Sequence, residues 1–109
     1  MYDSIVDALK AIPDLPVAEH EWKTRPVGNH ATVQLDFGAA DDEGEDAHQD
    51  QAYEGSVDLF TKGKAQAVAA QVEAVLEEIC GASWHLNSQQ YDRAIGMIHR
   101  EYVFEIEVL

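Results

Sequence analysis

Carboxylates are the most concentrated reactive groups in this chain. Between Asp36 and Asp58 the sequence reads DFGAADDEGEDAHQDQAYEGSVD, with nine Asp and Glu residues and no Lys or Arg. Clustered carboxylates bind divalent cations, act as general acids and bases, or form an acidic surface that meets a basic partner. Six central residues are the candidates for an acidic loop that faces a channel or a partner: Asp41, Asp42, Glu43, Glu45, Asp46 and Asp50.

A metal site is the first chemistry to compare with this pattern. An EF-hand calcium loop needs ligands at alternate positions, a glycine at the sixth position and a distal bidentate Glu. Counted from Asp41, the glycine comes at the fourth position and that Glu is missing, so the motif fails. Loose binding of a divalent cation stays open as an alternative. The five histidines form no HxxxH pair and there is no CxxC, so we expect no metal site and no cofactor.

Nucleophilic catalysis also lacks a recognisable pattern. The chain has no GxSxG elbow and no GxGxxG or GxxxxGK[ST] phosphate loop. Cys80 is the only cysteine, which excludes an intrachain disulfide and suits a reducing compartment. It falls on the apolar stripe of an expected helix, where a buried and inert thiol is the usual outcome. We therefore expect a protein that is not an enzyme.

One short segment combines an aromatic residue with basic residues. Trp22 is followed by Lys23 and Arg25. Trp22 at a strand end could pack into the core. Alternatively, Trp22, Lys23 and Arg25 form a subunit interface, because Trp and Arg are enriched at such surfaces. The sequence leaves both interpretations open.

The composition limits the class of protein that can hold these groups. A chain of 109 residues with 46% hydrophobic and 26% charged residues suits one globular domain, residues 1–109. The net charge of −14 repels phosphate backbones, so we expect no binding to free nucleic acid and none to an anionic membrane. An acidic wall past which DNA slides remains compatible with this charge. No apolar run approaches the length of a membrane span.

Hydrophobic periodicity predicts the elements of the first half. Tyr2 to Ile12 show helical spacing, which Pro13 ends. Strands are expected at 17–22 and 30–37 because apolar and polar residues alternate there. Periodicity is lost over 38–51, which we interpret as a long acidic hairpin loop. Its charges either serve assembly or simply keep a solvated turn soluble.

The second half contains the strongest helix signal. After a strand at 51–60, residues 61–80 carry one apolar stripe, with Thr61 as the expected N-cap and Gly81 after the C-terminus. Strands at 82–92 and 98–109 follow. The order α-β-β-β-α-β-β predicts an α+β fold, an antiparallel or mixed sheet of about five strands with two helices on one face.

This layout resembles a known family. A short helix precedes a strand that ends in WKTRP, and YEGSVDLFTKGKAQAVAAQVEAVLEEI runs from a strand into the long helix. The segment SWHLNSQQYDRAIGMIHREYVFEIEV forms a terminal hairpin. Together they resemble the small tail-terminator and head–tail joining proteins of long-tailed phages and prophages, over nearly the whole chain.

The resemblance implies a non-enzymatic virion protein. Members of this family form rings, commonly hexameric, at the head-proximal end of the tail. The implied partners are further copies of the chain, a tail tube protein and a head–tail connector protein, with DNA only as passing cargo and no membrane. The implied location is the tail or neck of a virion assembled in the host cytoplasm. The alternative is a small acidic adaptor or inhibitor that docks on a basic partner.

Overall fold

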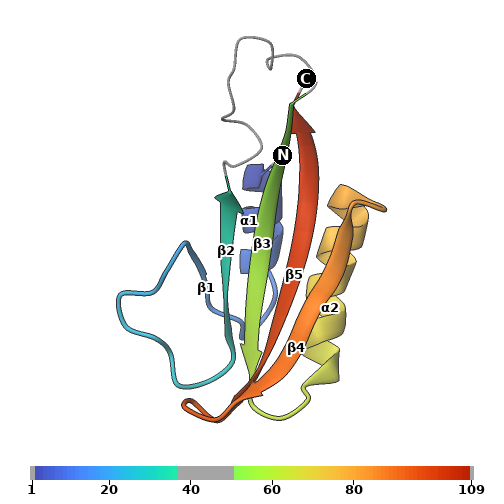
Figure 1. Cartoon of the computed structure of the whole chain (residues 1–109). Coiled ribbons are helices and arrows are strands. Elements are labelled where there is room, and N and C mark those ends of the chain that lie inside the picture. The colour runs from blue at the N-terminus through green and yellow to red at the C-terminus, as the bar shows by residue number, and fades with distance from the viewer. Residues whose placement is uncertain (1, 37–50, 109) are drawn as a thin grey trace.

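The computed structural model of the chain describes residues 2–36 and 51–108 (Figure 1). The elements are α1 (Tyr2–Lys10), β1 (Val17–Glu19), β2 (His30–Asp36), β3 (Gln51–Thr61), α2 (Gln66–Cys80), β4 (Trp84–Asp92) and β5 (Met97–Val108). This order confirms the α-β-β-β-α-β-β arrangement expected from the sequence.

The strands form one mixed five-stranded sheet in the order β1-β2-β3-β5-β4. β1 pairs with β2 in parallel, whereas β2–β3, β3–β5 and β4–β5 are antiparallel. Both helices lie behind the same side of the sheet in Figure 1. The other side, which carries neither helix, is called the open face below.

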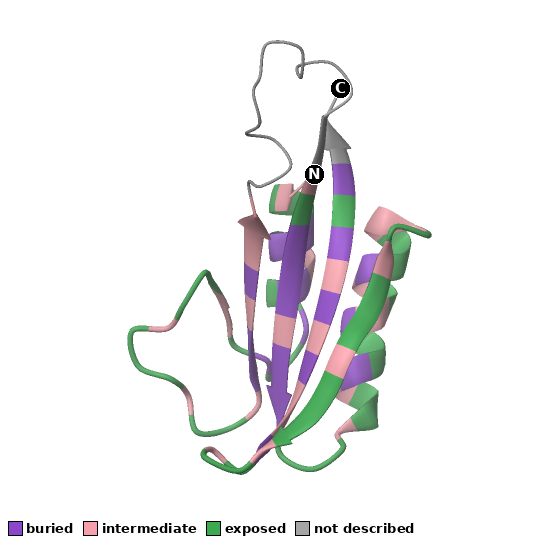
Figure 2. Cartoon of the chain, viewed as in Figure 1, coloured by how far each residue is buried: buried purple, intermediate pink, exposed green. Residues whose placement is uncertain are grey.

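The core lies between the helices and the covered side of the sheet. Alternate residues of β2, β3 and β5 point toward the helices, as the period of two in the sequence predicts. The long central strands are buried or alternately buried in Figure 2. The core cluster is completed by both helices and contains Ile5, Val6, Leu9, Ile12, Leu15, Ala31, Val33, Val57, Leu59, Ala69, Val72, Leu76, Tyr102, Phe104 and Ile106.

The start of α2 differs from the sequence expectation. Thr61 does not cap the helix, because the alternation of β3 continues through Thr61, which pairs with Ile98 of β5. Gly63 and Ala65 then have φ angles of 66° and 41°, and this turn delays the helix to Gln66. At the other end, Gly81 ends the helix as expected, and its N–H donates to the carbonyl of Glu77. Its φ is 59°, but its ψ of −124° lies outside the left-handed helical region, so the expected left-handed conformation is wrong.

The first strand is also shorter than expected. β1 ends at Glu19 instead of residue 22, because His20 adopts a φ of 68°, which breaks an extended strand. The His20 N–H still donates to the carbonyl of Val33 at 2.9 Å. Trp22 therefore belongs to the connection between β1 and β2, called the 20–29 loop below.

Candidate functional site

Three rings stack across the open face near one end of the sheet. His30 on β2, Phe60 on β3 and His99 on β5 are direct cross-strand partners. The His30 and Phe60 ring centroids are 4.9 Å apart, and those of Phe60 and His99 are 4.3 Å apart, with nearly parallel planes in both pairs. Such offset stacking stabilises neighbouring strands beyond simple burial.

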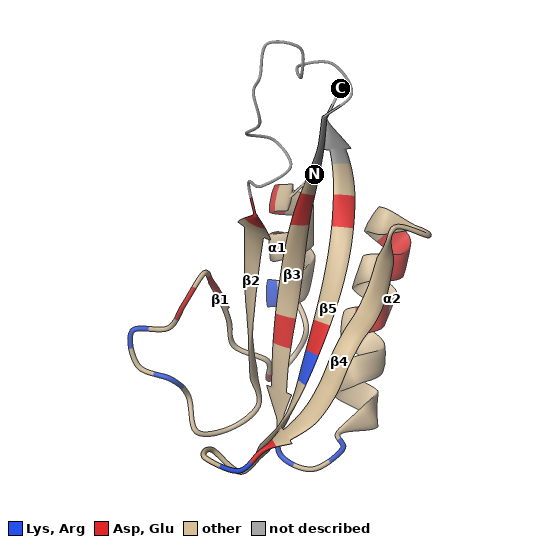
Figure 3. Ribbon diagram, viewed as in Figure 1, with Lys and Arg blue, Asp and Glu red and all other residues tan. Residues whose placement is uncertain are grey.

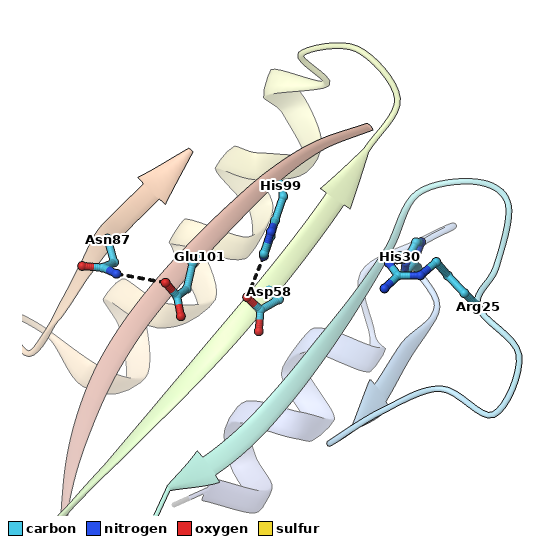
Figure 4. A network of polar contacts seen from close by, with 6 residues as sticks. All are labelled: Arg25, His30, Asp58, Asn87, His99 and Glu101. Atoms are coloured by element: carbon cyan, nitrogen blue, oxygen red, sulfur yellow. Dashed lines mark hydrogen bonds and ion pairs between the residues drawn. The ribbon is translucent and has the colours of Figure 1, made fainter. Parts of the chain in front are cut away.

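The 20–29 loop lies against this ring stack. The Arg25 guanidinium is 4.6 Å from the centre of the Phe60 ring, a cation–π contact. Figure 4 shows Arg25 reaching from the loop to His30, where Arg25 Nη1 lies 3.2 Å from His30 Nε2. Trp22 meets His30 edge-on, with a centroid distance of 6.0 Å. Trp22 is outside the core cluster, so its interpretation as a core residue is wrong.

The contacts of His30 fix its tautomer. Nδ1 lies 2.8 Å from the carbonyl oxygen of Gly28, which can only accept a hydrogen bond, so Nδ1 carries the proton. Nε2 is then the acceptor for the Arg25 N–H. Burial lowers the pKa of His30 and the Arg25 charge lowers it further, while the hydrogen bond to Gly28 opposes them. Neutral His30 therefore holds the 20–29 loop through its hydrogen bonds to Gly28 and Arg25.

A hollow of about 430 Å³ lies over this region. Its lining is formed by His20, Glu21, Trp22, Arg25, Thr32, Asp58, Phe60 and His99. Within it, His99 Nε2 and Asp58 Oδ1 are 2.7 Å apart, as Figure 4 shows. The Nε1 of Trp22 is buried and has no hydrogen-bond partner among the described residues. The Arg25 guanidinium and the unused N–H donor of Trp22 therefore lie beside the aromatic surface of Phe60. Such a combination suits contact with a protein.

Carboxylates dominate the open face toward the opposite end of the sheet. Asp36 pairs with Glu54, and Glu54 with Glu105, so three like charges stand directly opposite one another on adjacent strands. These three residues are called the acidic row. Asp58 faces Glu101 in the same way, although Glu101 also accepts a hydrogen bond from Asn87 (Figures 3 and 4). Directly opposed like charges destabilise a sheet, so a contribution to the stability of the fold does not explain this pattern.

Of the three residues expected at a subunit interface, Trp22, Lys23 and Arg25, the structure brings two together. Trp22 and Arg25 converge on the ring stack, whereas Lys23 is exposed on the same loop without a contact to the stack. The acidic-loop candidates all lie outside the described residues: Asp41, Asp42, Glu43, Glu45, Asp46 and Asp50.

Sequence reasoning missed the stack itself and the acidic row. Strand alternation places His30 on the polar side of β2, but only the register of β3 and β5 aligns it with Phe60 and His99.

Other chemistry has little support in the described part of the chain. No group of three or more His, Cys, Asp or Glu residues there could hold a metal ion. Burial raises the pKa of the Cys80 thiol, which keeps it protonated and a weak nucleophile. Among residues 2–36 and 51–108, neither helix has the length and hydrophobicity required to cross a bilayer.

Acidification should weaken the protein through His30. The unfolded imidazole takes up a proton near its ordinary pKa of 6.5, whereas the folded one does so only at lower pH. The contribution of neutral His30 is therefore present above about pH 6.5 and is lost as the pH falls through the folded pKa. Urea unfolding midpoints at pH 7.5 and 5 should show this loss. A His30→Gln variant should show a smaller difference, and an unchanged difference would contradict the assignment.

The comparisons with known proteins concern the fold. No protein-family model and no curated protein matches this chain. Among solved structures, it is similar to a chain in one described as "Virion of native gene transfer agent (GTA) particle", with a TM-score of 0.61 and 16% identity. The similarity covers 99% of this chain and 93% of that chain. At this identity it demonstrates a shared fold over nearly the full length of both chains.

Proposed function

We propose that this chain is a structural protein of a phage or prophage virion. In this proposal the chain forms a ring of six copies that ends the tail tube at its head-proximal side. The ring also joins the tube to the head connector. One observation carries the proposal: the fold similarity to a chain of a gene transfer agent virion spans both chains almost completely. The family resemblance of the sequence supports the more specific assignment to the tail terminus.

The charge of the open face fits a ring through which DNA passes. We propose that the open face lines the channel and that the helices face outward. The acidic row and the Asp58–Glu101 pair would then repel the phosphates of passing DNA and prevent it from sticking. The six acidic-loop residues would add to this field by their charge alone: Asp41, Asp42, Glu43, Glu45, Asp46 and Asp50.

Tails that lack their terminator provide the test. Purified protein should bind one end of such tails and stop their elongation, with ring-shaped density at that end in electron micrographs. An unrelated acidic protein of similar net charge is the control, because nonspecific adsorption would be common to both. Tails that stay uncapped and keep growing at saturating protein would refute the proposal.

The acidic row also favours a second candidate function. A small adaptor or inhibitor could dock this surface on a basic protein without forming a ring. Affinity capture from the producing cell would then yield one basic partner, with binding that weakens as the salt concentration rises. Glu54→Gln with Glu105→Gln should reduce that capture, whereas capping of tails by the same variant would favour the ring.

A further inference from the structure

We propose that copies of this chain join edge to edge, with the 20–29 loop of one copy seated on the β4 edge of the next. This inference rests on the ring proposed above and names the surfaces that form it. The two surfaces lie at opposite edges of the sheet, beside β1 and at β4 (Figure 1).

Exposed apolar side chains mark these two edges. Among the described residues, three large hydrophobic side chains are exposed: Val27 by 80%, Tyr91 by 64% and Leu86 by 42%. Val27 lies in the 20–29 loop, and both Leu86 and Tyr91 lie on β4. None occurs on the outer surfaces of the helices. Removal of such groups from water favours association in proportion to the area covered.

β4 has the properties of an unprotected edge. It is the last strand of the sheet, so one row of its backbone N–H and C=O groups has no partner strand. Residues 84–91 include no Lys, Arg, Asp, Glu or Pro that would discourage pairing. A register shift between Leu86 and Ser88 is the only irregularity in its pairing with β5. An edge of this kind accepts an extended segment from another chain.

The 20–29 loop is held ready for such a contact. Arg25 binds His30 and lies on Phe60, His30 binds the carbonyl of Gly28, and Asn29 Oδ1 accepts a hydrogen bond from the Lys62 backbone at 2.8 Å. These contacts fix both flanks of Val27. A loop already ordered in the free protein loses less conformational entropy on binding.

The two edges also carry opposite charges. The 20–29 loop carries Lys23 and Arg25, neither of which forms an ion pair with a described carboxylate. Beside β4, the last turn of α2 carries Glu77 and Glu78 and no basic residue, as Figure 3 shows. Carboxylates are unfavourable at a helix C-terminus, so a cation from a neighbouring copy would stabilise this end. Glu77 is adjacent to β4, since it accepts a hydrogen bond from Trp84 Nε1.

The contact joins two different surfaces and is therefore heterologous. Repeated around an axis with a rotation that closes, such a contact forms a ring, whereas a two-fold contact uses one self-complementary patch and stops at two copies. This difference makes the proposal testable with single cysteines. In a Cys80→Ala background, Val27→Cys and Tyr91→Cys are made in separate chains, mixed, and treated with a short bismaleimide.

The mixture should yield a cross-linked dimer that neither single variant yields alone. A chain carrying both cysteines should yield a ladder that ends at the ring size. Asp7→Cys, exposed on α1, replaces Tyr91→Cys as the matched control and should not cross-link to Val27→Cys. In the wild-type background, Tyr91→Lys or Val27→Asp should shift the particle mass toward the 12.1 kDa monomer.

The outcomes separate this inference from the proposed ring. If the wild-type protein assembles but the cysteine pair does not cross-link and both charge variants assemble equally well, the edge contact is wrong and the ring stands. Cross-linking of Val27→Cys to itself would indicate a two-fold contact and would also overturn it. A wild-type protein that stays monomeric on tail ends would refute both proposals.

Discussion

Val72→Asp should abolish the cooperative folding of this domain. Val72 is fully buried on α2, in the cluster that joins both helices to the sheet. An unpaired buried charge costs about 3–5 kcal/mol, and loss of a buried Val side chain costs about 1.5–3 kcal/mol. Together these approach the whole stability of a typical domain, about 5–15 kcal/mol. Circular dichroism during thermal unfolding should show no sigmoidal transition.

Ala74→Asp is the matched control on the same helix. Ala74 is exposed two residues further along, so the added carboxylate stays in water. Its cost should be below about 1 kcal/mol, which is the loss of helix propensity. If both variants unfold alike, or if Val72→Asp keeps a wild-type transition, the packing of α2 on the sheet is wrong.

Gly55→Ala should destabilise the protein by about 1–3 kcal/mol, as overpacking in a close-packed core does. Gly55 lies on β3 opposite Phe104 of β5 and Leu35 of β2. A Cβ there would lie 2.7 Å from the carbonyl oxygen of Gln34 and still closer to Cζ of Phe104. The Phe104 ring thus occupies the space that the missing side chain leaves. Urea unfolding should show a lower midpoint with an unchanged slope.

Two further variants serve as controls for Gly55→Ala. Gly28→Ala, where a Cβ would meet no atom within 4 Å, should leave the midpoint nearly unchanged. Phe104→Leu combined with Gly55→Ala should cost less than the sum of the two single changes, because the smaller side chain relieves the contact. Strict additivity of the two changes would mean that Gly55 and Phe104 do not compete for the same space.

The core was predictable because it depends on local periodicity. Alternation in β3 and β5 identifies Val57, Leu59, Tyr102 and Phe104 as inward-facing, and all four are buried. The spacing of apolar residues in α2 identifies its buried stripe in the same way. These assignments need no knowledge of which strands are neighbours.

Boundaries failed where a single backbone angle ends an element. The sequence suggests that β1 reaches Trp22, but the positive φ of His20 ends it, and no residue type there signals this change. Likewise, Thr61 is a good N-cap by residue type, yet its pairing with Ile98 retains it in β3. Tertiary pairing overrides local preference in such cases.

The candidate site was only partly predictable because it depends on register. Trp22 and Arg25 were identified from their residue types. The role of Phe60 required knowledge that β3 lies between β2 and β5 and that His30 and His99 are its direct partners. The acidic row has the same origin, since Glu54 and Glu105 are far apart in the sequence.

The central position of β5 determines when folding can finish during synthesis. β5 follows every other element along the chain, yet it lies between β3 and β4 and supplies Tyr102, Phe104 and Ile106 to the core. On the ribosome, the emerging helices and earlier strands therefore have no complete core until this last strand leaves the exit tunnel. A translation pause before Met97 would leave the apolar side chains of β3 and α2 without their partners on β5.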